Sequence, residues 1–318
     1  MSSARQIVDA VADAVLYEGY LLYPYRPSAV KNRVRWTFGV VHPRAWSEAT
    51  GGTEPWRLEA GCLLRHAAGC RLQVSVRFLH PLERRGAEGS WQEASERTAG
   101  PWDLGLAELL RSPVELPIDV PAAVLEEEGV RREWRPLQGT VEVEARPLPV
   151  AGCAVLRVGV SNTTRLGDPG SLSRDRVMAW SLASAHAVLR VASGEFVSCA
   201  DPPPELRAAA EGLRQRGWWP VLVGEPGTGD CLLLSPIILE DYPRVAEESP
   251  GDLFDATEID ELLTLRILGL SEAEKAELRR GDERARRLLE RTESLTPAEL
   301  MRLHGAIRER RIRRGWER

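Results

Sequence analysis

Cys62, His66 and Cys70 are the residues whose types and spacing come closest to a metal site, because they recur every four positions. Thiolate and imidazole groups are preferred zinc ligands, and on one helix this spacing would put all three on one face. The flanking residues alternate as strands do, however, and no fourth ligand is visible. We therefore expect no metal and no cofactor, and interpret the thiols as small buried groups; a Cys/His metal-handling protein is the alternative.

Histidines are scattered along the chain, and only His186 lies within an apolar run, Ala-Ser-Ala-His-Ala-Val. The sequence has neither the G-x-S-x-G elbow of α/β-hydrolases nor the H-E-x-x-H motif of zinc proteases. We therefore assign no catalytic residue and interpret His186 as a core histidine. An enzyme with an unrecognised active site near His186 is the alternative.

Glu225-Pro-Gly-Thr-Gly-Asp230 is a glycine-rich loop between two strand-like runs. A phosphate cradle would need a helix N-terminus after the loop, and a Walker motif would end in Gly-Lys-Ser/Thr. Both features are missing, and the two acidic residues would repel a phosphate. The pattern therefore predicts a hairpin turn.

Charge is strongly divided in the C-terminal part of the sequence. Positions 245–275 carry nine acidic and two basic residues, whereas positions 276–318 carry thirteen arginines and eight acidic residues. Either neighbouring helices neutralise each other, or the segment presents a bipolar surface to a partner protein.

Apolar side chains among the acidic ones suit an anchor with a charged rim, and the Trp-Trp pair before Pro220 is of the kind that anchors interfaces. The alternatives are that Phe254 packs under the first C-terminal helix and that the tryptophans belong to the core. The candidate docking residues are Tyr242, Glu247, Glu248, Asp252, Phe254, Asp255, Trp218 and Trp219.

Composition narrows the class of protein. The 318 residues are 43% apolar and 28% charged, which is typical of a globular protein. No apolar run approaches the ~20 residues that cross a bilayer, and a net charge of -5 gives no overall basic field for nucleic acid. Arg5, Asp9 and Asp13 interrupt any signal-peptide core, so we expect a cytoplasmic protein with reduced cysteines.

The periodicities predict an α+β protein in three parts. An N-terminal antiparallel β-sandwich-like domain is expected over 1–165, a mixed α/β region over 166–245, and a C-terminal helical module over 246–318. Alternating runs that indicate strands lie at 33–41, 56–64, 71–79, 139–145 and 153–161.

Turn and cap signals predict the connections. Hairpin turns are expected at 66–69 and 192–194, and a long surface loop over 83–100. Helices are expected over 3–16, from Asp201 to Gly217, and over 257–268, 272–292 and 297–312. Ser271 and Glu274 stand at the spacing of a capping box.

Two stretches, Tyr17–Trp36 and Ser235–Leu262, resemble uncharacterised proteins encoded beside high-affinity [NiFe]-hydrogenases in actinobacteria and related soil bacteria. The resemblance implies a non-enzymatic accessory or assembly factor that docks on a hydrogenase subunit or a maturation protein. It implies no catalytic residue, because no chemistry is assigned to that family.

Overall fold

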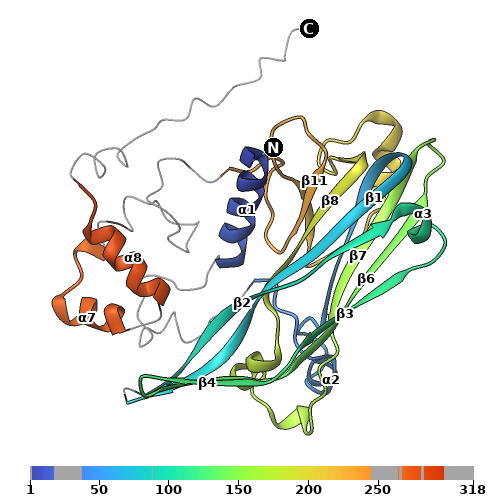
Figure 1. Ribbon diagram of the computed structural model, residues 1–318. Helices are drawn as coiled ribbons and strands as arrows, with labels where there is room; N and C mark the ends of the chain where they lie inside the picture. Colours follow the sequence, from blue (N-terminus) through green and yellow to red (C-terminus); the bar gives the residue numbers. More distant parts are fainter. Residues whose placement is uncertain are drawn as a thin grey trace. The chain divides into compact units, whose positions relative to one another are not determined.

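The computed structural model describes residues 2–17, 38–87, 89–244, 264, 267–280 and 283–296 (Figure 1). The chain forms two compact units, one of residues 1–20 with 33–244 and one of residues 21–32 with 245–318. The first unit is built on a large antiparallel sheet with helices, so the predicted α+β class is confirmed.

Eleven strands form the sheet among the described residues, and its main path has the order β10-β11-β8-β1-β7-β6-β3. Strands β2 and β5 also pair with β1, β4 pairs with β5, and the short β9 pairs with β1. The strands are β1 (Arg57–Gly86), β2 (Gly89–Gly105), β3 (Val114–Val120), β4 (Ala123–Glu127), β5 (Val130–Trp134), β6 (Leu137–Pro147), β7 (Cys153–Asn162), β8 (Ala183–Val197), β9 (Gln215–Arg216), β10 (Trp219–Leu222) and β11 (Cys231–Ser235).

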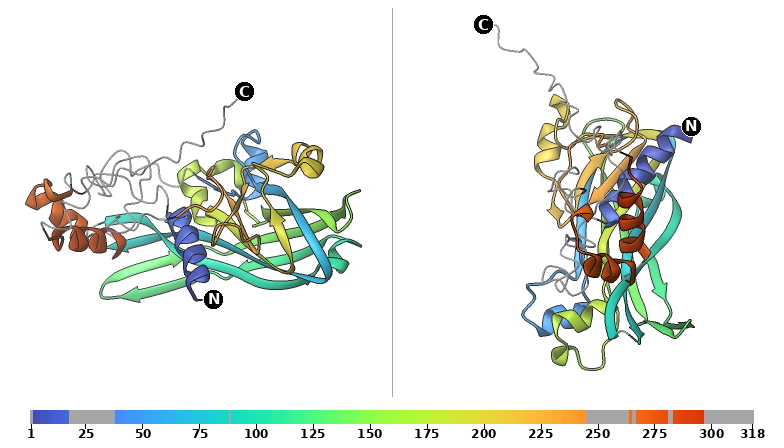
Figure 2. Two further views of the ribbon diagram at one scale, coloured as in Figure 1. Left: turned by 90° about the horizontal axis from the view of Figure 1, so that it is seen from above. Right: turned by 90° about the vertical axis from the view of Figure 1, so that its left-hand side faces the viewer.

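Helices of the first unit are short apart from α1 (Ser2–Tyr17), which confirms the helix predicted over 3–16. The apolar face of α1, including Val11 and Val15, packs on Val188 and Leu233 of the sheet, and Figure 2 shows α1 lying across the strands. The others are α2 (Arg44–Ala49), α3 (Leu106–Leu109), α4 (Arg174–Val177), α5 (Arg207–Glu211) and the 3-10 turns η2 (Pro169–Ser171), η3 (Met178–Trp180) and η4 (Pro204–Leu206).

β1 runs without a break through the segment predicted as a hairpin turn at 66–69. His66 faces Gly194 of β8 and Arg71 faces Ala192, so both parts of β1 are antiparallel to the same strand. The predicted hairpin is therefore wrong. Between these two pairs β1 advances by five residues and β8 by two, so the surplus residues of β1 form a bulge. Gly69 lies in this bulge with a φ of 74°, and a positive φ was predicted for it.

The turn predicted at 192–194 is also wrong, for a related reason. It lies opposite the bulge of β1, and β8 continues through it, with Ser193 at φ 59°. Two turn sequences on neighbouring strands thus lie opposite each other, and the two strands stay paired on both sides of them. We call this region, at residues 66–71 of β1 and 192–194 of β8, the bend.

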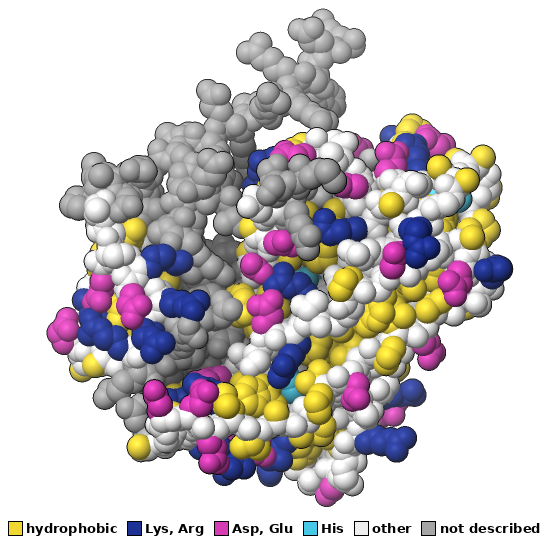
Figure 3. All heavy atoms as spheres, in the orientation of Figure 1, with side chains coloured by type: hydrophobic (Ala, Val, Ile, Leu, Met, Phe, Trp, Pro, Cys, Tyr) yellow, Lys and Arg dark blue, Asp and Glu magenta, His cyan; other side chains and the backbone are white. Residues whose placement is uncertain are grey.

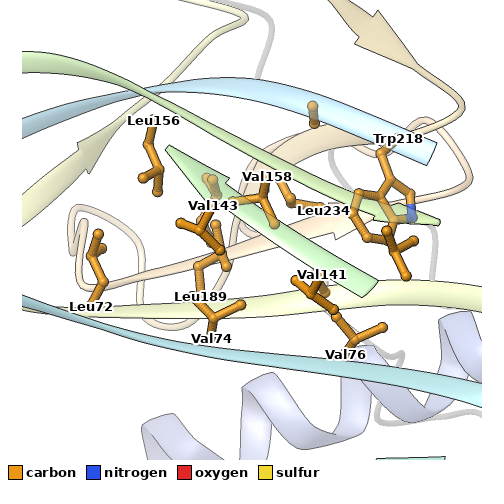
Figure 4. Close-up of a cluster of buried hydrophobic side chains, with 14 of the residues drawn as sticks. Leu72, Val74, Val76, Val141, Val143, Leu156, Val158, Leu189, Trp218 and Leu234 are labelled. Atoms are coloured by element: carbon orange, nitrogen blue, oxygen red, sulfur yellow. The ribbon is translucent and has the colours of Figure 1, made fainter. Parts of the chain in front are cut away.

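Side chains from both sides of the bend share one core. Leu72, Val74, Val76 and Phe78 of β1 are buried on one face, which confirms the predicted alternation. They belong to the same cluster as Leu156 and other side chains of β6, β7 and β11 (Figure 4). Because apolar burial is the main stabilising term in folding, this cluster holds the strands together.

The predicted surface loop over 83–100 is wrong, because β1 and β2 form a long hairpin there that closes at Gly86 and Gly89. Strand β5 adds to β1 at positions 83–85, and β4 adds to β5 (Figure 1). We call this extension, made of residues 80–97 with β4 and β5, the arm.

Residues 166–245 do not form a separate region, because β8, β10 and β11 pair within the same sheet as β1. The helix predicted from Asp201 to Gly217 is limited to η4 and α5, and Gln215 begins β9. The hairpin turn predicted at Glu225–Asp230 is confirmed, because β10 and β11 pair on either side of it.

In the second unit, the described residues include the helices α7 (Glu272–Arg280) and α8 (Glu283–Glu293) where one helix was predicted. The capping box is confirmed: Ser271 N–H donates to Glu274 Oε2 (2.9 Å) and Glu274 N–H to Ser271 Oγ (3.3 Å). The helix predicted over 297–312, and all but three residues of 257–268, lie outside the described residues. No described helix is long and apolar enough to cross a bilayer.

Candidate functional site

A groove of about 520 Å³ lies between β2 and β3 of the first unit. One wall is β2 over 97–102, the other is β3 over 117–120 with the following Pro121, and Phe78 of β1 contributes from the core. In the space-filling view, hydrophobic side chains form a band over the face where β2, β3 and β6 lie (Figure 3). We call this cavity the β2–β3 groove.

The local sequence explains why the groove stays open. Val74 of β1 faces Trp102 and Val76 faces Ala99, so Gly100 and Pro101 form a bulge in β2. Gly100 has φ 90°, and a Cβ there would lie 2.8 Å from the Val74 carbonyl oxygen, so only glycine fits. Within the described residues, β2 pairs only with β1 and β3 only with β6, which leaves their facing edges unpaired.

Arg97 connects the groove to the arm. It lines the groove, and its Nε is buried without a hydrogen-bond partner. Arg97 stands opposite Phe78 in the ladder, and the next pairs on the same face are His80 with Ser95 and Leu82 with Glu93. The face that is apolar around Phe78 therefore becomes polar along the arm.

Charged groups on this face of the arm form a compact cluster. Arg84 faces Arg132 directly across the β1–β5 ladder, an arrangement that is repulsive alone. Glu93, only 7% exposed, lies against both: Oε1 is 3.2 Å from Arg84 Nε and Oε2 is 2.9 Å from Arg132 Nε. Arg84 also stacks 3.9 Å from the Trp91 ring centre. Glu93 therefore neutralises the two facing arginines, one from β1 and one from β5, and so allows the two strands to pair.

Buried polar atoms without hydrogen-bond partners gather on this face. Such atoms normally have partners in folded proteins, so a group of them on one face is unusual. Among the described residues they are His80 Nδ1, Arg84 Nη1, Trp91 Nε1 and Arg97 Nε, whereas Arg84 Nε and Glu93 Oε1 form the ion pair described above. Most of these atoms are hydrogen-bond donors, which suits groups that accept hydrogen bonds.

The structure describes three of the predicted docking residues, Trp218, Trp219 and Tyr242. Trp218 is fully buried and its Nε1 donates to the Ala185 carbonyl (2.7 Å), so the exposed-pair interpretation is wrong for it. Trp219 is half-buried in β10. Tyr242 packs against the core and donates its hydroxyl to the Thr228 carbonyl (2.9 Å). Glu247, Glu248, Asp252, Phe254 and Asp255 lie outside the described residues.

His186 is buried on the face of β8 opposite the core cluster. Its Nδ1 lies 3.1 Å from the Ser184 carbonyl, and burial lowers its pKa to about 4. A neutral, enclosed imidazole suits the core interpretation. The acidic segment that the enzyme alternative would place beside it lies outside the described residues.

A serine–histidine–carboxylate series of contacts, which no sequence pattern indicates, links the segment 38–56 to the residue that follows η3. His42 Nδ1 lies 3.1 Å from Ser181 Oγ, and His42 Nε2 lies 3.6 Å from Glu54 Oε2. Ser181 is fully buried and donates to the Val177 carbonyl, and burial lowers the pKa of His42 to about 4. The buried hydroxyl cannot contact a substrate, so we interpret these contacts as a structural link between two segments. No sequence signal reveals it, since its members lie far apart.

Cysteine chemistry is suppressed by burial. Cys62 and Cys70 both lie in the core cluster, and burial raises the pKa of each thiol. Burial also raises the pKa of Cys199 to about 11 and that of Cys231 to about 12. Across the described ranges, no three His, Cys, Asp or Glu side chains gather closely enough to hold a metal ion.

Comparison with known proteins adds no family to this geometry. Neither the protein-family models nor the curated proteins match the sequence. The β2–β3 groove and the arm thus stand as the candidate site on their structure alone. Sequence patterns missed both, because a groove between two strand edges depends on which strands fail to pair.

Proposed function

We propose that the protein is a non-enzymatic accessory factor that acts by binding a partner protein, and that β4 is a docking edge. The observation that carries this proposal is the outer edge of β4. Within the described residues β4 pairs only with β5, and all five of its residues are exposed. Val124 is 52% and Leu125 is 40% exposed, so this unpaired edge carries two exposed large apolar side chains.

An unpaired strand edge with apolar side chains is a template for another strand. Its free N–H and C=O groups can pair with an extended segment of a partner, while side-chain pockets provide specificity. Glu126 and Glu127 at the end of β4 would keep the edge from pairing with unrelated strands, and Arg131 of β5 contacts Glu126 (2.6 Å).

The resemblance supplies the context of the proposal: a cytoplasmic factor that docks on a hydrogenase subunit or maturation protein. The finer architecture belongs to the same proposal. The sheet would act as a sandwich whose two layers meet at the bend, and residues 246–318 would act as a helical module. That module would carry the acidic docking segment around Glu247 and Glu248 as a second contact.

The test is co-purification from the native host with the hydrogenase subunits and maturation proteins as the readout. A Val124→Lys, Leu125→Lys double variant should lose the partner while its melting temperature stays unchanged. Ile238→Lys is the control, because Ile238 is 76% exposed but lies outside β4. A Glu247→Arg, Glu248→Arg variant tests the second contact. Full partner recovery with the β4 variant would contradict the docking edge.

A further inference from the structure

We infer that the β2–β3 groove binds an extended peptide segment of a partner protein that presents a carboxylate side chain between apolar ones. This site is separate from the edge of β4, so each proposal can fail without the other.

The shape of the groove argues for an extended ligand. One wall is 97–102 of β2, the other is 117–120 of β3 with Pro121, and the two strands do not pair with each other. Six extended residues span roughly 20 Å at about 3.3 Å per residue, so such a segment matches the length of the longer wall. A volume of about 520 Å³ also lies in the range of ligand-binding clefts.

Arg97 argues for a carboxylate. Four other arginines of the arm each contact a carboxylate, namely Arg84, Arg85, Arg131 and Arg132. Arg97 makes no ion pair in the part of the chain that the structure describes, and its Nε is buried without a partner. A guanidinium in this state gains strong, charge-assisted hydrogen bonds from a carboxylate that enters the groove.

The remaining lining defines the rest of the ligand. Trp102 is partly buried and offers apolar surface in the groove, and the buried Phe78 and Ile118 make the rest of the lining apolar, which favours apolar neighbours of the carboxylate. Asp119 lies on the opposite wall and suits peptide N–H groups or a basic side chain.

Prolines in the walls decide how the peptide is recognised. Pro101, Pro117 and Pro121 have no N–H to donate, so neither wall presents a complete row of backbone donors. A further strand therefore cannot pair fully along the groove, and the side chains must supply most of the selectivity. This distinguishes the groove from the edge of β4, which contains no proline.

An array of acetylated, amidated hexapeptides tests the inference on the full-length protein. Each peptide carries one Glu between two varied apolar residues and is matched by a twin with Gln. The best Glu peptides should bind at least tenfold more tightly than their Gln twins. Arg97→Gln should abolish this preference, Arg97→Lys should keep part of it, and Arg111→Gln, at an exposed position outside the groove, should leave it unchanged.

Three results would overturn the inference. They are equal binding of the Glu and Gln twins, a preference that survives Arg97→Gln in a folded variant, and binding of free butyrate as tight as that of the best peptide. If Arg97→Gln does not fold, the intermediate preference of Arg97→Lys decides. The β4 double variant should bind the peptides as the wild type does, so this result separates the groove from the docking edge.

Discussion

The arm and the rest of the sheet, which we call the body, use the same strand, β1, in different ways. Up to Phe78, the inner face of β1 is filled with aliphatic and aromatic side chains. Beyond it, the same face carries His80, the buried Leu82 and Arg84, and Arg84 forms an ion pair with Glu93 of β2. Strand pairing thus rests on apolar burial in the body, whereas in the arm charge neutralisation adds to it. The two regions should therefore respond to different perturbations.

The largest effect is expected in the body. Val76→Asp would bury an unpaired carboxylate in the core and should unfold the first unit, because such burial costs several kcal/mol. Gln73→Asp, on the exposed face of the same strand, should change the free energy of unfolding by less than about 1 kcal/mol. Thermal melts of the two variants provide the measurement. Equal melting temperatures would show that β1 does not present this face to the core.

Acid should act on both regions through three buried histidines. Burial lowers the pKa of His42, His80 and His186 from 6.5 to about 4, so the native state keeps them neutral while the unfolded chain binds protons. Stability is therefore full above pH 6.5 and is lost as the pH falls towards 4, by roughly 3 kcal/mol for each histidine.

Chemical denaturation at a series of pH values measures this loss. His186→Gln, in the body, and His80→Gln, in the arm, should each reduce the slope of the free energy of unfolding against pH between pH 6.5 and 4. An unchanged slope in both variants would mean that these side chains do not titrate on unfolding.

A smaller, local effect is expected from the arm. Glu93→Gln leaves Arg84 facing Arg132 without neutralisation, so β5 should detach from β1 before the body unfolds. Hydrogen exchange of amides 123–134 should become at least tenfold faster, with little change in the melting temperature. Glu126→Gln removes an exposed ion pair with Arg131 and should have almost no effect. Equal exchange rates in the two variants would remove the special role of Glu93.

The same contrast explains what could be predicted from the sequence. The alternation over 71–79 predicts a strand, because apolar burial leaves a period of two. Residues 83–100 indicate a loop, because strands held by charge pairs have the composition of a loop. The turn signals at 66–69 and 192–194 were located correctly, with Gly69 at positive φ. The structure that each turn sequence adopts, however, depends on the segment of the neighbouring strand that lies opposite it. Here the two turn sequences face each other, and β1 and β8 stay paired on both sides of them.

The groove could not be predicted for a further reason. Arg97 and Asp119 carry no motif, and only the pairing of β2 with β1 and of β3 with β6 brings their two edges together. Trp218 shows the opposite error, because an aromatic pair beside a proline indicates an interface, whereas the Ala185 carbonyl binds this indole inside the core.

The bend also has a consequence for the order in which the chain folds during synthesis. The first partner of β1 to leave the ribosome is β2, which is local, but β7 follows only after residue 152 and β8 after residue 182. At a translation rate of roughly 5–20 residues per second, β1 therefore waits for several seconds with part of its 30-residue length unpaired. A nascent chain stalled before β8 should bind chaperones, whereas one that includes β11 should be released.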